Sequence, residues 1–169
     1  MRWIDQLSDW AGRLSAWMFF VIACMITWEV VARYVFLAPT IWAEEMSQFF
    51  QIWATYLAAG WVLKNRQLIV IDLFLVRMWP RLRRIVDIFS LLFIALFCGV
   101  AIYYGSEILL ESIRMGRATS TMLGVPKWMT ESAIPVGFGL LLLQTLAELL
   151  RQLRGDAPAI AGTDFGSLD

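Results

Sequence analysis

The stretch PTIWAEEMSQFFQIWATYLAAGWVLKNRQLIVID, residues 39–72, decides the fold that we predict for this chain. Two adjacent carboxylates, Glu44 and Glu45, precede an uncharged run of 18 residues, and Lys64 follows that run directly. A helix rises about 1.5 Å per residue, so a run of this length nearly crosses a bilayer core of about 30 Å. The stretch therefore predicts a membrane-spanning helix over about residues 43–63.

The composition of the whole chain agrees with a membrane setting. Of its 169 residues, 60% are hydrophobic and 17% are charged, and the mean hydropathy is +0.67. Such a composition leaves too little polar surface for a water-soluble protein. The formal net charge is zero, which gives no electrostatic reason to expect a nucleic-acid partner. We therefore predict an integral membrane protein that contacts membrane lipids and binds no nucleic acid.

The chain lacks the residues that the usual catalytic and cofactor sites need. It contains no His, the commonest ligand of metals and haem and a common proton carrier. It has no Gly-rich phosphate loop, and no Ser or Cys is placed beside a His base. Cys24 and Cys98 both lie in apolar runs, where we expect small packing residues rather than a disulfide. We therefore predict a protein that is not an enzyme and has no cofactor.

Further apolar runs extend the prediction to four membrane-spanning helices, at about residues 14–36, 43–63, 86–112 and 129–150. The short connection after the first run makes the first two spans antiparallel neighbours. Residues 155–169 have too little apolar content to fold, so we predict a disordered tail. The predicted fold class is an all-α integral membrane protein in which residues 1–154 form a single four-helix membrane domain.

Two amphipathic segments are predicted to lie in the plane of the membrane interface. Over residues 2–13, apolar and charged residues alternate at helical spacing, and Trp3 and Trp10 are expected to face lipid. Over residues 68–84, Trp79 accompanies cations that are expected to face lipid phosphates, namely Arg77, Arg81, Arg83 and Arg84.

The distribution of cations also predicts the orientation of the chain. Residues 64–84 hold 6 of the 14 Lys and Arg residues. Loops that are rich in Lys and Arg stay on the cytoplasmic side of a membrane. With four spans, the N-terminus and the C-terminus are then both cytoplasmic.

Charged and polar side chains around the first connection are predicted to have structural roles. Glu29 and Arg33 lie four residues apart, on one face of the first span. Because the connection is short, Arg33 reaches the level of Glu44 and Glu45, and we predict that it is the nearest partner of at least one of them. Thr40 is predicted to cap the second span.

A polar and small stripe along the second span is predicted to form an interface. Gln48, Gln51, Thr55 and Ala58 recur at helical spacing, and such stripes let helices approach and form hydrogen bonds inside a membrane. Packing within this one chain is the alternative. We favour an interface with another subunit, because a small bundle has little interior in which to hide two Gln and two Glu.

Small residues and proline in the last two spans predict local features of packing. Ala95 and Gly99 are expected to allow close approach of another helix. Pro135, together with Gly137 and Gly139, is expected to kink or loosen the last helix near the end that follows the long connection.

Four short motifs add to the prediction from spacing. They are P-T-x-W-x-E-E at residues 39–45, V-x-D at 70–72, L-G-V-P-K-W at 123–128 and I-P-V-G at 134–137. Together with the length and the four-span layout, these motifs resemble the DctQ-type small membrane subunit of TRAP (tripartite ATP-independent periplasmic) transporters. The resemblance covers about residues 14–150. Trp42 and Asp72, which lie in the motifs, join the residues for which we predict structural or subunit-interface roles: Arg33, Glu44, Glu45, Gln48, Gln51 and Thr55.

The resemblance implies a non-catalytic small permease subunit that braces a large multi-span membrane subunit. Together with a periplasmic substrate-binding protein, the two subunits would take up an organic acid or related solute across the bacterial inner membrane, driven by a sodium gradient. The alternative is a self-contained four-span protein, either a small exporter or a homo-oligomeric channel with Glu44 and Glu45 along the route.

Overall fold

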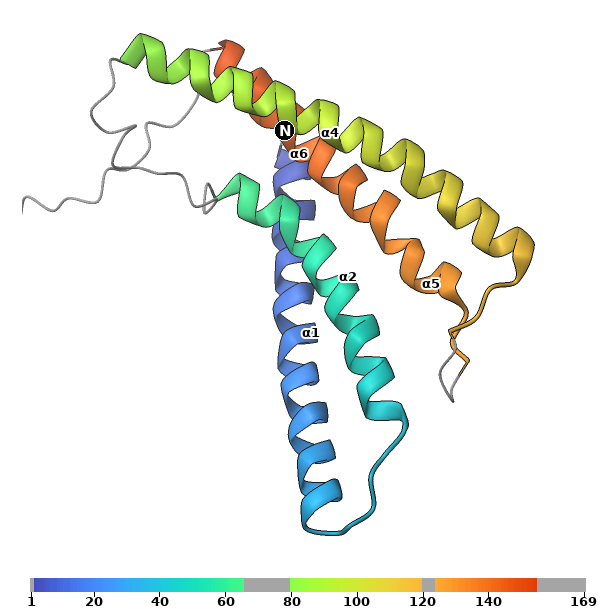
Figure 1. The fold of residues 1–169 in the computed structure, drawn as a ribbon. Coiled ribbons are helices and arrows are strands. Elements are labelled where there is room, and N and C mark those ends of the chain that lie inside the picture. The colour runs from blue at the N-terminus through green and yellow to red at the C-terminus, as the bar shows by residue number, and fades with distance from the viewer. Residues whose placement is uncertain (1, 66–79, 120–123, 155–169) are drawn as a thin grey trace, which may run out of the picture.

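The computed structural model describes residues 2–65, 80–119 and 124–154, and these residues are almost entirely helical (Figure 1). The helices are α1 (Arg2–Tyr34), α2 (Trp42–Lys64), α4 (Pro80–Met115), α5 (Lys127–Glu131) and α6 (Ala133–Arg154). A single isolated β-bridge, between Ala118 and Pro126, closes the connection from α4 to α5. The described chain therefore has the predicted all-α class.

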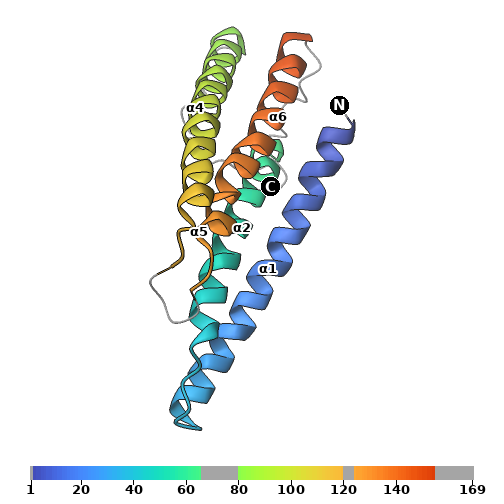
Figure 2. The ribbon, with the colours of Figure 1, turned by 90° about the vertical axis from the view of Figure 1, so that its right-hand side faces the viewer.

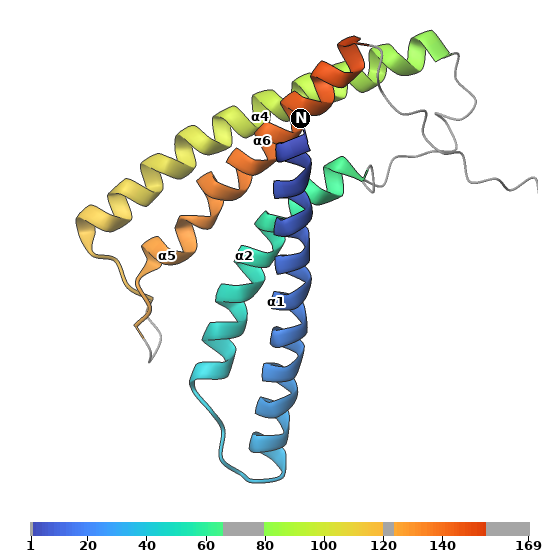
Figure 3. The same cartoon turned by 180° about the vertical axis from the view of Figure 1, so that it is seen from behind.

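The helices form two antiparallel hairpins that meet at the centre of the molecule. α1 packs on α2, α4 packs on α6, and α2 contacts α6 between them. In Figure 1 the α1–α2 hairpin points downward while the α4–α6 hairpin runs toward the lower right, and Figure 3 shows the same divergence from behind. Figure 2 shows both hairpin connections toward one end of the molecule, with the N-terminus, the start of α4 and the end of α6 toward the other. The arrangement is an open V rather than a closed bundle.

Among the described residues, three stretches are long and apolar enough to cross a membrane, judged by length and composition: Trp3–Tyr34, Ile85–Met115 and Lys127–Arg154. They contain the predicted spans at about residues 14–36, 86–112 and 129–150. α2 is the helix expected at residues 43–63, but it is not among the three stretches, because Gln48, Gln51 and several aromatic groups lower its hydropathy. The described helices are those of an all-α membrane protein.

α1 is one continuous helix that includes both the predicted amphipathic segment at residues 2–13 and the predicted first span. Ser8 and Ser15 are buried, and Lys64 of α2 lies 2.6 Å from the Asp9 carboxylate. These contacts hold the first turns of α1 in line with the rest of the helix. The helix predicted over residues 2–13 is present and runs without a break into the first span, while its location in the membrane interface stays a prediction. On the outside of the same turns Trp3 and Trp10 are 83% and 65% exposed.

The second predicted interfacial helix, residues 68–84, lies mostly outside the described residues. Asp72, Arg77 and Trp79 are among the residues not described, as is the tail at 155–169. The described part begins at Pro80, the first residue of α4. The backbone at Arg81, Arg83 and Arg84 therefore belongs to the first turns of α4 and is continuous with the predicted third span.

Glycines allow close packing between and within the hairpins. A Cβ atom added to Gly137 of α6 would lie 2.4 Å from the Cβ of Tyr56 on α2. One added to Gly105 of α4 would lie 2.7 Å from Cγ2 of Ile134 on α6. No described part of this chain lies within 4 Å of a Cβ placed on Gly99, so the close approach predicted there is not made within the described chain. The glycine that serves the α4–α6 contact is Gly105.

The last predicted span, at about residues 129–150, is divided into two helices near its N-terminal end. α5 ends at Glu131, and α6 begins at Ala133 after a turn at Ser132. Pro135 has no N–H with which to continue the helical hydrogen bonds, and it lies in the first turn of α6, where proline is tolerated. The interruption confirms the loosened turn that was expected around Pro135.

Candidate functional site

A first polar cluster, Glu29, Arg33 and Thr40, closes the connection between α1 and α2. Nη2 of Arg33 donates to Oε1 of Glu29 at 2.8 Å. Oε2 of Glu29 accepts the backbone N–H of Thr40 at 3.0 Å and a further bond from the Thr40 hydroxyl. Glu29 is buried. The cluster confirms the predicted Glu29–Arg33 pair, and it attaches the connection to the end of α1.

Two predictions at this end of the hairpin differ from the structure. The N-cap position of α2 is Ile41, whose aliphatic side chain cannot make a capping bond. The Thr40 hydroxyl bonds to Glu29 instead of capping α2. The ion pair of Arg33 is with Glu29 in its own helix rather than with Glu44 or Glu45.

The remaining acidic residues of this region lie in the first turn of α2. Glu44 is exposed there and Glu45 is half-buried, while Trp42 begins the helix and is exposed. The structural role predicted for these three residues stays a prediction.

A second polar cluster, the terminal cluster, lies at the opposite end, where α1, α2 and α6 meet. Arg151 forms ion pairs with Asp5 and with Glu148, whose Oε1 lies 2.6 Å from Nη1 of Arg151. Glu148 also accepts a hydrogen bond from Nε2 of Gln144 at 3.2 Å. The Ser8 hydroxyl donates to Oε1 of Gln144 at 2.8 Å. α1 and α6 are thus joined by a chain of charged and polar groups.

Lys64 connects α2 to the terminal cluster. Its Nζ lies 2.6 Å from Oδ1 of Asp9 and donates to the Asp5 carbonyl at 3.1 Å. Gln144 and Glu148 are both buried. Buried amides and carboxylates are tolerated only when hydrogen-bonded or paired, as these are. The terminal cluster therefore holds three helices in register at one end of the molecule.

Sequence reasoning missed the terminal cluster, although a signal for it was present. Gln144, Glu148 and Arg151 recur at spacings of four and three, so they share one face of the last helix. Their partners lie in the first turns of α1, which we had placed in the membrane interface. Without that partner, the polar face of the last helix had no predicted neighbour.

The polar stripe predicted on α2 faces away from the rest of the described chain. Gln48, Gln51 and Thr55 are exposed, and Ala58 is half-buried. The Thr55 hydroxyl donates to the Gln51 carbonyl of its own helix at 2.8 Å. The stripe therefore remains at the surface of this chain.

The other faces of α2 are used for packing within the chain. Toward α1, the Ser15 hydroxyl donates to the Ala54 carbonyl at 2.7 Å, and Ala54 is fully buried. Toward α5, Nε1 of Trp53 donates to the Met129 carbonyl at 3.0 Å. The face that carries the stripe is thus distinct from the two faces that hold α2 in the fold.

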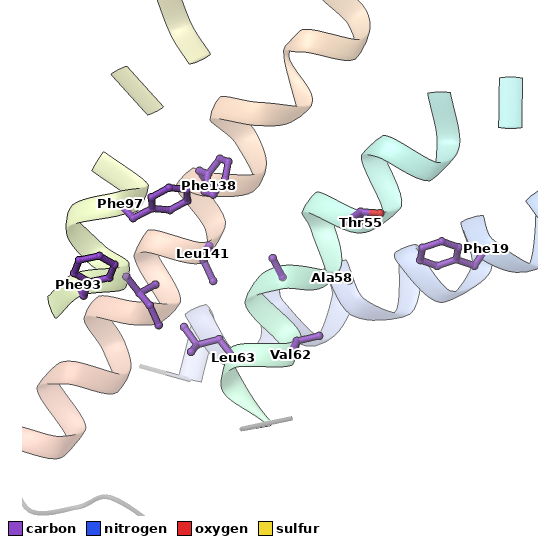
Figure 4. Close-up of a pocket in the computed structure, with 11 residues that line it drawn as sticks. Phe19, Thr55, Ala58, Val62, Leu63, Phe93, Phe97, Phe138 and Leu141 are labelled. Atoms are coloured by element: carbon purple, nitrogen blue, oxygen red, sulfur yellow. The ribbon is translucent and has the colours of Figure 1, made fainter. Parts of the chain in front are cut away.

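An apolar groove of about 530 Å³ continues the stripe toward the Lys64 end of α2 (Figure 4). Phe19 of α1 borders the groove, as do Ala58 and Val62 of α2 and Phe93 and Phe97 of α4. None of its lining residues is charged. The groove lies between the two hairpins, and all four long helices contribute residues to it.

The described residues contain no group of three or more His, Cys, Asp or Glu side chains placed to hold a metal ion. What they present instead is a pair of internal polar clusters, an exposed polar stripe and an apolar groove. The clusters hold helices of this chain together. The stripe and the groove are surfaces that another helix can cover.

Comparisons with known proteins place the chain among transporter components. The family model "Tripartite ATP-independent periplasmic transporters, DctQ component" matches residues 22–155. The chain is 30% identical over 150 residues to the isethionate TRAP transporter permease protein DctMQ of Oleidesulfovibrio alaskensis, with 83% of this chain and 23% of that protein covered. It is 24% identical over 106 residues to the sialic acid TRAP transporter permease protein SiaT of Haemophilus influenzae, with 62% and 17% covered. The chain spans less than a quarter of the length of these curated relatives.

Proposed function

Because this chain belongs to the DctQ component family of tripartite ATP-independent periplasmic (TRAP) transporters, we propose that it braces the large membrane subunit of such a transporter. In this proposal it is the non-catalytic small permease subunit. The large subunit carries the solute and moves relative to the membrane, and this chain supplies a static part beside it.

The observation that carries the proposal is the exposed polar stripe on α2. Gln48 and Gln51 are exposed in the half of α2 nearest Trp42, and the helices before and after α2 in the chain are of membrane-spanning length. An amide that faces hydrocarbon without a hydrogen-bonding partner costs several kcal/mol, roughly 4–8 by transfer to an apolar liquid. A protein surface that covers the stripe removes that cost, which supports a partner subunit.

We further propose that α1, α2, α4 and α6 each cross the bacterial inner membrane, with both chain ends cytoplasmic. The two hairpin connections lie toward one end of the molecule (Figure 2), as four alternating crossings require. The cation-rich residues 64–84 follow α2 and support a cytoplasmic location for that end.

The greater length of the relatives supports a large partner subunit for this chain. In each of them, more than three quarters of the polypeptide lies outside the aligned region. We propose that the corresponding part here is a separate large subunit, which works with a periplasmic substrate-binding protein. The relatives are named for isethionate and sialic acid, both organic anions. We propose sodium-driven uptake of an organic acid or a related solute.

A self-contained exporter or homo-oligomeric channel is the alternative, and flux through proteoliposomes distinguishes the two. We expect vesicles that hold this chain alone to pass sodium, potassium and organic anions no faster than empty vesicles. Vesicles that also hold the large subunit should take up solute when the loaded binding protein and a sodium gradient are supplied. Ion conductance by this chain alone would contradict the proposal and favour a channel.

A further inference from the structure

We propose that one transmembrane helix of the large subunit packs along a single face of α2, an inference that rests on the proposed function. This face, the α2 seam, consists of Gln48, Gln51, Thr55, Ala58 and Val62. The partner helix presents hydrogen-bonding side chains to the two glutamines and large apolar side chains to the groove beside Ala58 and Val62.

The spacing of the seam specifies how a helix fits it. Its positions recur at steps of three, four, three and four residues. This is the repeat of helices that pack with a left-handed crossing of about 20°. From Gln48 to Val62 the seam is about 21 Å long at 1.5 Å per residue. It therefore matches most of one membrane crossing.

The seam is the face of α2 that the other described residues leave uncovered. Ala54 lies against α1, as its carbonyl accepts the Ser15 hydroxyl. Tyr56 lies against α6, where its Cβ would collide with any side chain on Gly137. The described helices therefore occupy the other two faces of α2, and a third helix can approach only along the seam.

The half of the seam nearest Trp42 sets the polar chemistry of the partner. Gln48 and Gln51 are exposed, and each amide offers both donors and an acceptor. Inside a membrane such groups form hydrogen bonds across a helix interface rather than face lipid. The partner helix at this level therefore carries Asn, Gln, Ser or Thr.

The half nearest Lys64 sets the apolar chemistry of the partner. Here Ala58 and Val62 border the groove of about 530 Å³, with Phe19 on α1 and Phe97 on α4 also bordering it (Figure 4). A helix about 10 Å across fills about 120 Å³ for each residue of its length, so the groove holds side chains rather than a whole helix. The partner helix therefore lies over the groove and inserts residues such as Leu, Ile or Phe.

A second copy of this chain fits the observations less well. The relatives are named permease proteins and carry more than three quarters of their length outside the region that matches this chain, so this region is accompanied by further, different sequence there. An antiparallel twofold pair would place the glutamine half of one seam against the apolar groove of the other. A parallel twofold pair would place Ala58 and Val62 against their own copies, so no large side chain would enter either groove. We therefore assign the seam to the large subunit.

The test compares matched substitutions in complexes purified in mild detergent. Ala58→Trp fills the groove, whereas Ala23→Trp adds the same bulk to an exposed position on α1. We expect Ala58→Trp to lower the amount of co-purified large subunit at least about tenfold, and Ala23→Trp to leave it unchanged. Replacing both Gln48 and Gln51 by Leu should weaken association by about three- to thirtyfold. Thermal unfolding of each variant alone should match that of the natural chain, because the substituted side chains are not needed for its own packing.

A photo-reactive amino acid at Thr55 gives an independent result. The expected product is a covalent adduct with the large subunit. An adduct of twice 19.4 kDa, or adducts with lipid alone, would overturn the assignment of the seam. Normal association of both the Ala58→Trp and the double Leu variants would overturn it too, while leaving the proposed function standing. Failure of the natural chain to co-purify with any large subunit would overturn both.

Discussion

Asp5 and Arg151 form an ion pair although 146 positions separate them, and the pair joins the first turn of α1 to the last turn of α6. The side chains are 22% and 20% exposed, so both charges are largely withdrawn from solvent. Glu148 shares the same guanidinium. The two hairpins are thus fastened together at this end and diverge toward the other (Figure 1).

Removing the shared cation should destabilise the fold. We expect Arg151→Gln to lower the free energy of unfolding by about 1–3 kcal/mol, because it leaves two carboxylates without their partner in a partly buried site. Arg154→Gln changes an exposed cation in the same last turn and should alter stability by less than about 0.5 kcal/mol. Thermal unfolding in detergent, followed by tryptophan fluorescence, measures both. Equal effects of the two substitutions would contradict a structural role for the terminal cluster.

The contact between the hairpins depends on a glycine, and a matched pair of substitutions tests it. Gly137→Ala places a methyl group 2.4 Å from the Cβ of Tyr56, so the helices must separate, at a cost of about 1–3 kcal/mol. Gly139→Ala meets nothing within 4 Å and should stabilise α6 by about 0.5–1 kcal/mol through helix propensity. We therefore expect Gly137→Ala to lower the free energy of unfolding and Gly139→Ala to raise it. A stabilising effect of Gly137→Ala would show that α2 and α6 do not pack as described.

Glu29, at the connection of the α1–α2 hairpin, should contribute more to stability than the exposed Glu44. Glu29→Gln removes the ion pair with Arg33 and weakens both bonds from Thr40, so we expect it to lower the free energy of unfolding. Glu44→Gln changes an exposed group and should cost less than about 0.5 kcal/mol. Denaturant titration of the purified chain gives both values. A larger loss of stability for Glu44→Gln than for Glu29→Gln would contradict the structural role given to Glu29.

The proposed orientation predicts which sites an impermeant thiol reagent can reach in cells. In a background without Cys24 and Cys98, Lys127→Cys should be labelled from outside, and Arg154→Cys should be labelled only after the membrane is opened. Both positions are exposed in the structure, so folding does not hide either of them. The reverse pattern of labelling would place the two chain ends outside.

Local sequence patterns predicted the elements of the fold and its short-range contacts. The uncharged runs marked the helices, spacing of four residues marked the Glu29–Arg33 pair, and Pro135 marked the interruption before α6. Each of these features depends on residues close together in the chain. The exposed stripe on α2 was visible for the same reason, since helical spacing alone places its members on one face.

Contacts between distant segments could not be predicted in this way. Asp5 reads as one charge of an amphipathic surface helix until Arg151 is known to lie beside it. Likewise Gly99 and Gly105 are indistinguishable in sequence, and only the position of Ile134 selects Gly105 as the contact. Thr40 had a suitable position for a cap, but the buried carboxylate of Glu29 competed for its hydroxyl. In each case the local sequence allowed more than one contact, and the tertiary structure determines which contact forms.

Co-purification in mild detergent tests the central claim, that this chain is the small subunit of a two-part permease. An affinity tag on this chain, expressed together with the genes that surround its own, should recover a large and very hydrophobic protein in a one-to-one ratio. The ratio can be measured by the mass of the intact complex. Recovery of this 19.4 kDa chain alone, or bound only to copies of itself, would contradict the account.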